Sequence, residues 1–209
     1  MRCSKFDLLL AGAPYSGYSC LFKTATGFVT RITADNQIEV LMLQLNPAIY
    51  KRTGGFWTFP GGTVDEQSRH ENPIDAFVRE FNEEARHKLV DKSWDDLFVN
   101  FPFTINVPDA ERRNSQGVWH NFGLYYFFAT LKNPNEEINL SDEHSAVIWI
   151  PIEKFIAPVT ANIAKDIELA VYVVNYINHP AVQSGIRRIH EETRSLMSSD
   201  ESVKRPRED

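Results

Sequence analysis

Residues 60–84 read PGGTVDEQSRHENPIDAFVREFNEE, a glycine turn followed by the pattern of an acidic helix. Within this stretch, Glu80, Glu83 and Glu84 stand at positions i, i+3 and i+4, which share one face of an α-helix. Three carboxylates this close repel one another, so the arrangement is costly unless a cation lies between them. Because hard oxygen ligands favour magnesium or manganese over zinc, the stretch predicts a site for Mg²⁺ or Mn²⁺.

The helix is predicted to begin at an Asn72 N-cap, with Pro73 in the first helical position. Arg79 lies four residues before Glu83 and can pair with it. The carboxylates fall mainly outside the apolar stripe of the helix, so they either face a cleft or form an ordinary solvated acidic face. The Gly-Gly turn favours the cleft, because glycine lets the backbone approach a bound ion or phosphate closely. The apolar stripe recurs at helical spacing and consists of Ile74, Phe77, Val78, Phe81, Ala85 and Leu89.

The segment Gly62–His87 resembles a Nudix box, the signature of MutT-like hydrolases that cleave nucleoside diphosphates linked to another group. Gly62 matches the leading glycine of that pattern, and Glu71 matches its first glutamate. Residues 79–84 match the block that reads Arg, Glu, a hydrophobic residue, any residue, Glu, Glu. The resemblance therefore implies a Nudix hydrolase that depends on divalent metal ions.

Two departures from the family pattern stand out. The loop before Glu71 carries three extra residues, which cost little in a loop. Arg86 and His87 replace a glycine and a hydrophobic residue. Because the usual left-handed helix stop is lost, the helix is expected to run on towards Leu89 or Val90.

The resemblance implies a role for each matched side chain. Arg79 would orient a carboxylate, and Glu71 would brace the loop. Glu83 and Glu84 would also act in catalysis. The implied metal ligands are Glu80, Glu83, Glu84 and the carbonyl group of Gly62.

Glu143 is the main candidate outside the box. It lies in Ser141-Asp142-Glu143-His144, just before a strand expected at 146–150. Nudix enzymes often place a further glutamate in the loop before this last strand, so the resemblance implies that Glu143 is a metal ligand or the general base. An ordinary acidic turn is the alternative. His144 and Glu111 are weaker candidates for the base.

Patterns outside the box predict strands and helices in a mixed order. A sheet between helices follows, which is an α+β fold of the α/β/α sandwich type with a mixed sheet, and the resemblance implies the same fold. A polar loop is expected at 108–117. Strands are expected at 21–32, 38–45, 56–59, 98–107, 118–131 and 146–150, and helices at 161–177 and 186–197.

Length and composition predict one folded domain over residues 1–180, which the resemblance implies is a Nudix hydrolase domain, with a C-terminal helix and polar tail over 181–209. Pro180 is expected to end the preceding helix. Ser198–Asp209 is nearly free of large apolar groups, so it is expected to be disordered.

The net charge of −6 argues against nonspecific binding to a nucleic-acid duplex, although a local basic patch can still bind an RNA end. Cys3 and Cys20 lack metal-ligand spacing and favour free thiols in a reducing compartment. No apolar run is long enough to span a membrane. We therefore expect a cytoplasmic protein, with a homodimer left open.

Substrate-binding groups are harder to predict. Arg52, Arg112 and Arg113 are candidates to bind the phosphates of a substrate, and the alternative is that they are ordinary solvated surface charges. The aromatic residues Trp57, Trp119, Tyr125 and Phe127 are candidates to stack on a base, although aromatic residues on strands more often form core. Tyr125 and Phe127 should share one strand face. The candidate substrate-binding residues are Arg52, Trp57, Arg112 and Arg113, with Lys51 beside them.

Pro102 lies fifteen residues past His87 and resembles a mark of the Nudix group that cleaves ADP-ribose. No tyrosine stands at the offset associated with dinucleoside polyphosphate hydrolases. These observations favour ADP-ribose or a related nucleotide sugar as the substrate. The alternatives are an enzyme that hydrolyses an RNA cap or a nucleoside triphosphate, and a Nudix module that senses a nucleotide without cleaving it.

Overall fold

The computed structural model describes residues 21–65, 71–86, 92–113, 119–156 and 158–203. Cys3 and Cys20 lie outside these ranges. Seven strands in the described residues form one sheet, with the order β3-β2-β1-β6-β5, while β4 pairs with β1 and β7 with β2. The pairing of β1 with β6 is parallel and the other pairings are antiparallel. The strands are β1 (Leu21–Ile32), β2 (Ile38–Leu45), β3 (Trp57–Thr58), β4 (Gly61–Thr63), β5 (Phe98–Arg113), β6 (Trp119–Leu131) and β7 (His144–Pro151).

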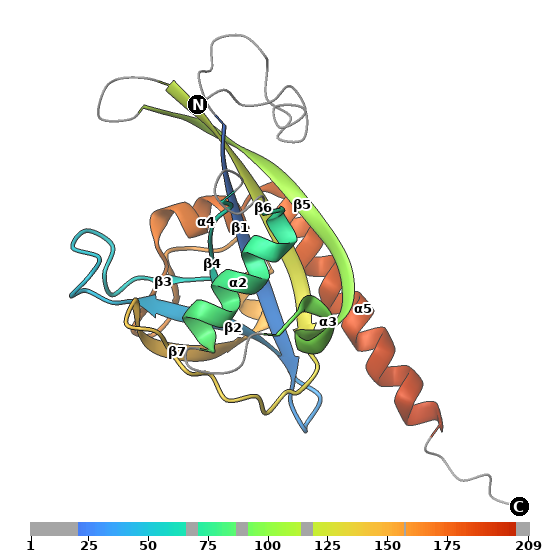
Figure 1. The fold of residues 1–209 in the computed structure, drawn as a ribbon. Coiled ribbons are helices and arrows are strands. Elements are labelled where there is room, and N and C mark those ends of the chain that lie inside the picture. The colour runs from blue at the N-terminus through green and yellow to red at the C-terminus, as the bar shows by residue number, and fades with distance from the viewer. Residues whose placement is uncertain (1–20, 66–70, 87–91, 114–118, 157, 204–209) are drawn as a thin grey trace, which may run out of the picture.

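Helices cover both faces of this sheet, which confirms the expected α+β sandwich with a mixed sheet (Figure 1). On one face lie α2 (Pro73–Ala85) and the short α3 (Trp94–Leu97). On the other lie the 3₁₀ turn η1 (Ile152–Phe155), α4 (Val171–Ile177) and α5 (Pro180–Val203).

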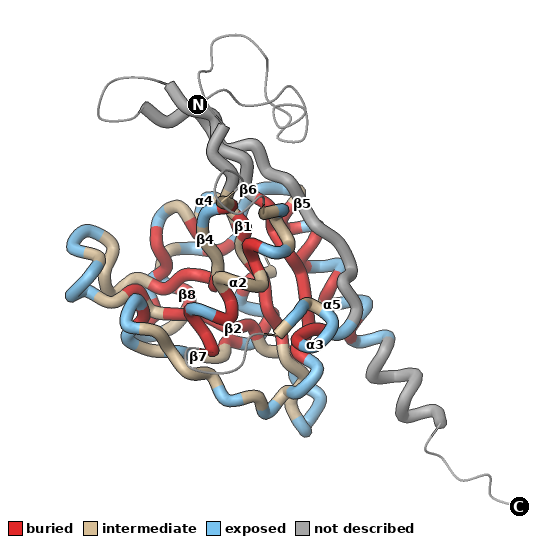
Figure 2. Tube along the Cα trace, in the orientation of Figure 1, coloured by how far each residue is buried: buried red, intermediate tan, exposed pale blue. Residues whose placement is uncertain are grey.

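Alternating strand residues fill the two cores, as a period of two requires. On β6, Tyr125 and Phe127 pack on the α2 face, which confirms that they share a strand face, while Tyr126 and Phe128 pack on the α5 face. The run 40–43 of β2 is buried on both faces. Figure 2 shows that the buried residues concentrate in the strands and in the helix sides that face them.

The beginning of α2 agrees with the prediction. The Asn72 side chain accepts hydrogen bonds from the backbone N–H groups of Ile74 (3.1 Å) and Asp75 (2.9 Å), and Pro73 opens the helix. Phe77 stacks on Phe127 of β6, with ring centroids 5.3 Å apart and an interplanar angle of 7°. The ring contact holds α2 against the sheet. The acidic residues of the helix lie beside this contact.

The end of α2 differs from the prediction. The helix ends at Ala85 instead of running on towards Leu89 or Val90. Arg86 turns out of the helix at φ −135°, and its side chain, only 4% exposed, forms an ion pair with Glu136 and a hydrogen bond to Asn82. The last helical carbonyl groups, of Ala85 and Glu84, accept hydrogen bonds from the backbone N–H groups of Asn139 (2.9 Å) and Ser141 (3.2 Å). A distant segment therefore supplies the stop that a glycine would otherwise provide.

Strand β5 is longer than predicted. The predicted loop at 108–117 is strand up to Arg113, so Glu111, Arg112 and Arg113 lie in β5 and not in a loop. Because β5 is at the end of the sheet order, it is an edge strand, where proline and charged residues are tolerated. Its pairing with β6 is interrupted by register shifts between Val99 and Phe103 and between Asp109 and Arg112.

The helix predicted at 161–177 is wrong in its first half. A short hairpin of β8 (Asn162–Ala164) and β9 (Ile167–Glu168) precedes α4. Asp166 has φ +63°, the left-handed geometry of a tight turn. Ile163 and Ile167 are both buried from opposite arms of this hairpin, so their four-residue spacing imitates helical periodicity.

Helix α5 begins at Pro180, six residues earlier than expected, and runs to Val203. Val182, Ile186 and Ile189 pack in the same core as the strands. Residues 198–203, expected to be disordered, are helical, and 204–209 lie outside the described residues. The domain boundary at residue 180 stays a prediction. Among the helices that the structure describes, none combines the length and the apolar character needed to cross a bilayer.

The buried pair of Arg86 and Glu136 gives a stability prediction. Arg86→Gly restores the glycine of the family pattern but leaves Glu136 without its cation. We expect the free energy of unfolding, measured by urea denaturation, to fall by roughly 3–5 kcal/mol. As a control, Arg188→Ala removes an exposed ion pair with Glu192 and should cost less than about 1 kcal/mol. Equal stability of Arg86→Gly and the wild type would contradict this account of the helix end.

Candidate functional site

The site begins at the turn between β3 and β4. Gly61 has φ +145°, and a Cβ atom there would overlap the backbone of Ala25 and Thr26 on β1. The Pro60 carbonyl accepts hydrogen bonds from Gly27 N–H and from the Thr26 hydroxyl, both at 2.9 Å. Glycine is therefore required at position 61, because the turn is held tightly against the sheet.

Glu84 connects this turn to helix α2. Its carboxylate is buried, and Oε2 accepts a hydrogen bond from Gly61 N–H at 2.8 Å. Burial raises the pKa of Glu84 well above its usual range; the Gly61 bond opposes this, and the charges of Glu80, Glu143 and Glu83 raise the pKa further. The four carboxylates are thus close enough to repel one another.

Glu80 lies against the second glycine of the turn. A Cβ atom at Gly62 would overlap the Glu80 carboxylate, so only glycine permits this approach. Burial raises the pKa of Glu80, Arg79 opposes this shift, and the charges of Glu83 and Glu143 add to it. Helix α2 therefore directs at least two carboxylates at the Gly61–Gly62 turn.

Arg79 holds the acidic residues in place. Its guanidinium donates to Glu71 (2.8 and 3.1 Å), to Glu80 (2.8 Å) and to Glu83 (3.0 Å), and also to the Thr63 carbonyl (3.1 Å). The contact with Glu83 confirms the predicted i, i+4 pair. Hydrogen bonds and charge from these carboxylates, Glu71 foremost, raise the pKa of Arg79, so it stays charged.

Glu71 has the bracing position that the resemblance implied. Besides its two bonds from Arg79, it accepts a hydrogen bond from Asp65 N–H at 3.0 Å. These contacts join the loop after β4 to the middle of α2.

Glu143 reaches the site from the loop before β7. Its carbonyl accepts from Asn46 N–H at 2.9 Å, and its Oε2 accepts from the Tyr50 hydroxyl at 2.6 Å. Its charge adds to the raised pKa of both Glu80 and Glu84. Sequence reasoning missed Tyr50, because nothing in the chain links a loop tyrosine to a residue 93 positions away.

His144 lies directly behind Glu84. Its side chain is buried, Nε2 is 3.8 Å from Glu84 Oε1, and neither ring nitrogen has a hydrogen-bond partner. Burial lowers the pKa of His144 to about 4, so the ring is neutral at pH 7. A buried ring of this kind is poorly placed to reach a water molecule on a substrate.

The donor set fits a hard divalent cation, since it consists of oxygen atoms whose negative charges repel one another. Among the described residues, however, no three His, Cys, Asp or Glu side chains are already grouped as a metal cluster. Arg79 explains this, because it engages both Glu80 and Glu83. A bound cation would take over part of the neutralising role that Arg79 fills here.

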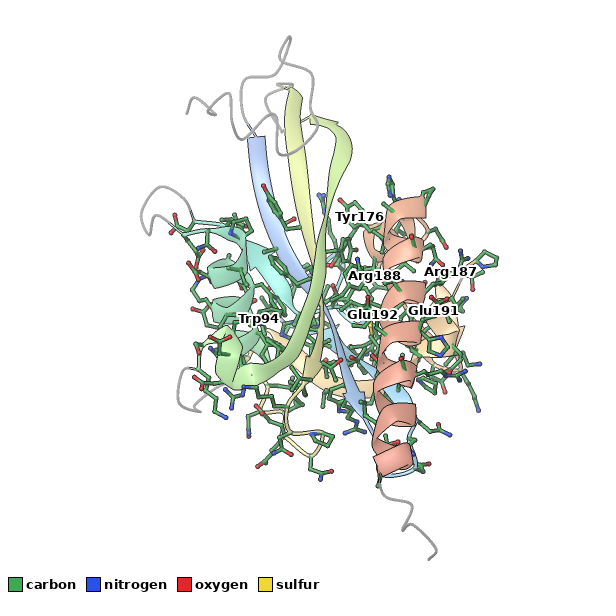
Figure 3. The ribbon with its side chains drawn as sticks, turned by 90° about the vertical axis from the view of Figure 1, so that its right-hand side faces the viewer. Trp94, Tyr176, Arg187, Arg188, Glu191 and Glu192 are labelled. Carbon is green, nitrogen blue, oxygen red and sulfur yellow. The ribbon has the colours of Figure 1, made fainter. Side chains whose placement is uncertain are left out.

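A pocket of about 230 Å³ opens beside the same turn. Gly61 and Gly62 form one wall, and Tyr126, Tyr172 and Tyr176 form others, from β6 and α4. Figure 3 shows Tyr176 on the side of the sheet that carries α5, opposite Trp94. Pockets for drug-sized ligands are roughly 300–1,000 Å³, so this one has room for a single ring system of a larger ligand.

Comparisons with known proteins agree with this geometry. A family model described as the NUDIX domain matches residues 22–169. The chain belongs to the Nudix family. It is therefore a Nudix pyrophosphohydrolase, as the box predicted.

Two solved structures share the fold. An Ap4A hydrolase from C. elegans, in a binary complex, is 22% identical with a TM-score of 0.53 and matches 83% of this chain and 98% of its own. The Nudix hydrolase RenU from M. smegmatis is 19% identical with a TM-score of 0.51 and matches 85% of this chain and 88% of its own. At these identities the likeness is evidence of the fold.

One relative is closer in sequence. The mouse (Mus musculus) asymmetrical bis(5'-nucleosyl)-tetraphosphatase is 28% identical over 120 residues, which are 57% of this chain and 69% of that protein.

The substrate-binding residues predicted for this Nudix hydrolase are scattered. Trp57 is only 7% exposed and belongs to the core, so it offers little surface for stacking on a base. Arg52 and Lys51 are exposed in the loop after β2. Arg112 and Arg113 are backbone-paired with His120 and Trp119, and the side chains of these four residues lie outside the described part.

Sequence reasoning also missed the tyrosine pocket. Tyr172 and Tyr176 are four residues apart on α4, a spacing that puts them on one helix face. The apolar positions of the same segment also recur at helical spacing, so the pair does not stand out from them. Tyr126 gave no signal, because its neighbours on β6 are all apolar or aromatic.

The repulsion between buried carboxylates gives a second stability prediction. In EDTA, Glu84→Gln should raise the free energy of unfolding by roughly 0.5–2 kcal/mol, because the amide oxygen can still accept from Gly61 and no charge is buried. Glu83→Gln, at a more exposed position, should change it much less. Urea denaturation at pH 7 measures both variants. A loss of stability in Glu84→Gln would show that its carboxylate is favourably paired and would contradict the repulsion inferred here.

Proposed function

We propose that this Nudix hydrolase uses Mg²⁺ or Mn²⁺ to cleave the anhydride bond of a nucleoside diphosphate linked to another group. The proposed ligands are Glu80, Glu83, Glu84 and the Gly62 carbonyl. The observation that carries the proposal is that the carboxylates of Glu80 and Glu84 both lie against the Gly61–Gly62 turn, beside the tyrosine pocket.

In this proposal, a divalent ion held by these residues would neutralise charge on the diphosphate and lower the pKa of the attacking water. Glu143 accepts a proton from that water as its oxygen attacks phosphorus in line. Arg79 fixes the directions of the Glu80 and Glu83 carboxylates. The P–O bond to the bridging oxygen breaks, that oxygen leaves with its electron pair and takes up a proton, and a nucleoside phosphate is released.

Dinucleoside polyphosphates are the first candidate substrates. Their support is the likeness to the mouse tetraphosphatase over 120 residues, together with a pocket sized for one ring system. ADP-ribose is the second candidate, supported by Pro102, which lies in β5. Both ligands present a base, which the pocket has room for, joined to an anhydride, which the proposed metal ligands would bind.

A substrate panel tests the function. Diadenosine tetraphosphate, ADP-ribose, capped RNA and a deoxynucleoside triphosphate are each incubated with the protein and Mg²⁺ or Mn²⁺, and products are identified by mass. We expect cleavage of diadenosine tetraphosphate, with label from heavy-oxygen water in one product. Cleavage of ADP-ribose alone would restore the nucleotide-sugar substrate. Cleavage of capped RNA would point to RNA-end processing, and tight binding without any cleavage would indicate a sensor.

Removing a metal ligand should abolish turnover. Glu83→Gln and Glu84→Gln should each lower kcat by roughly 10³-fold or more with the fold intact, because an amide is a poor ligand for a hard cation. Glu192→Gln, on the exposed side of α5, is the matched control and should keep wild-type activity. If Glu83→Gln and Glu84→Gln both keep full activity, and keep it when EDTA is added, metal dependence is disproved.

Glu143 is tested separately as the base. Glu143→Gln should lower kcat by roughly 10²-fold with a much smaller change in KM. Steady-state kinetics on the cleaved substrate measure both constants. Wild-type kinetics in this variant would return Glu143 to the role of a turn residue.

The homodimer, the cytoplasmic location and the RNA-end partner stay predictions, since none of the observations above bears on them.

A further inference from the structure

The loop between β2 and β3 is fastened to the loop that carries Glu143. Asn46 N–H donates to the Glu143 carbonyl at 2.9 Å, and Asn46 Nδ2 donates to the Asp142 carbonyl at 2.7 Å. The β2–β3 loop is also closed on itself, because Gly54 N–H donates to the Tyr50 carbonyl and Gly55 N–H to the Leu45 carbonyl, both at 2.7 Å. Tyr50 therefore has a fixed backbone position relative to Glu143.

From that position, the Tyr50 hydroxyl donates to Glu143 Oε2 at 2.6 Å. An O–H donor to a carboxylate at this distance forms one of the stronger hydrogen bonds in proteins. Burial raises the pKa of Tyr50, and the bond to Glu143 raises it further, so the phenol keeps its proton and remains a donor. Since Oε2 is occupied, Oε1 is the oxygen left to accept a proton from water.

The Glu143 side chain is otherwise weakly restrained. It is exposed, and within the described residues Tyr50 supplies its side-chain hydrogen bond. A free glutamate at the surface samples several rotamers, which lowers the fraction of time that its carboxylate faces the metal ligands. The proton acceptor needs a group that holds it within hydrogen-bond reach of the water.

We propose that Tyr50 is a positioning residue for this Nudix hydrolase, which fixes the Glu143 carboxylate with Oε1 directed at the attacking water. This inference rests on the proposed function, in which Glu143 is the base. It assigns Tyr50 a role in turnover and not in substrate binding. A tyrosine that stacked on a substrate base would instead contribute mainly to KM.

The test is a double-mutant cycle. Tyr50→Phe removes only the hydroxyl, and we expect kcat to fall roughly 10- to 100-fold while KM changes less than about threefold. In the Glu143→Gln background the same substitution should have almost no further effect, because Tyr50 acts through the carboxylate. Ile49→Ala changes an exposed side chain in the same loop and should leave both constants at wild-type values.

Three outcomes would overturn the inference. An unchanged kcat in Tyr50→Phe would show that the hydroxyl is not needed. A raised KM with normal kcat would make Tyr50 a substrate contact. A full additional loss in the Glu143→Gln background would show that Tyr50 acts independently. If Glu143→Gln alone has wild-type kinetics, the assignment of Glu143 as the base fails. This failure is distinct from a failure of the Tyr50 inference, because it is seen in a variant that still has Tyr50.

Discussion

The hydrogen bond from Gly61 N–H to the buried Glu84 carboxylate is the contact on which the rest of the site depends. It requires helix α2 and the β3–β4 turn to meet at 2.8 Å, while glycine at position 61 lets the same turn lie against β1 and glycine at position 62 leaves room for the Glu80 carboxylate. The packing of Phe77 on Phe127 and the Asn72 cap set the helix at the necessary distance from the sheet. The fold therefore places a charge where burial disfavours it, which proteins accept mainly where the charge has a use.

The residues around the buried Glu84 carboxylate are held in place by further contacts. Arg79 forms ion pairs with Glu71, Glu80 and Glu83 at once and so joins the loop to the helix. The segment 139–141 binds the free carbonyl groups at the end of α2 and leads directly to Glu143. The C-terminal end of the helix thus contacts the segment that leads to the proposed base, and the C-terminal half of the helix also carries the proposed ligands Glu80, Glu83 and Glu84. The chemistry of the site comes from three segments that are far apart in sequence.

Local sequence predicted what depends on neighbouring residues. The Asn72 cap, the apolar stripe of α2 and the pair of Arg79 with Glu83 all lie within one helix, and the structure has each of them. The features that were missed depend on distant partners. The end of α2 is set by Glu136, which pairs with Arg86 from a distant part of the chain, and Glu143 is held by Tyr50 from another loop. The edge position of β5 likewise could not be predicted from its polar composition. The substrate could not be predicted from the Nudix box, because the residues that would select it lie in strands and loops outside the box.

The central claim is that the carboxylates of α2 bind a divalent metal ion, and binding of Mn²⁺ measured by electron paramagnetic resonance tests it most directly. The free Mn²⁺ signal is titrated with wild-type protein, with Glu80→Gln, with Glu84→Gln and with the control Glu192→Gln. The account predicts that the wild type and the control bind Mn²⁺ alike and that each site variant binds roughly tenfold or more weakly. Equal Mn²⁺ affinity in all four proteins would contradict it.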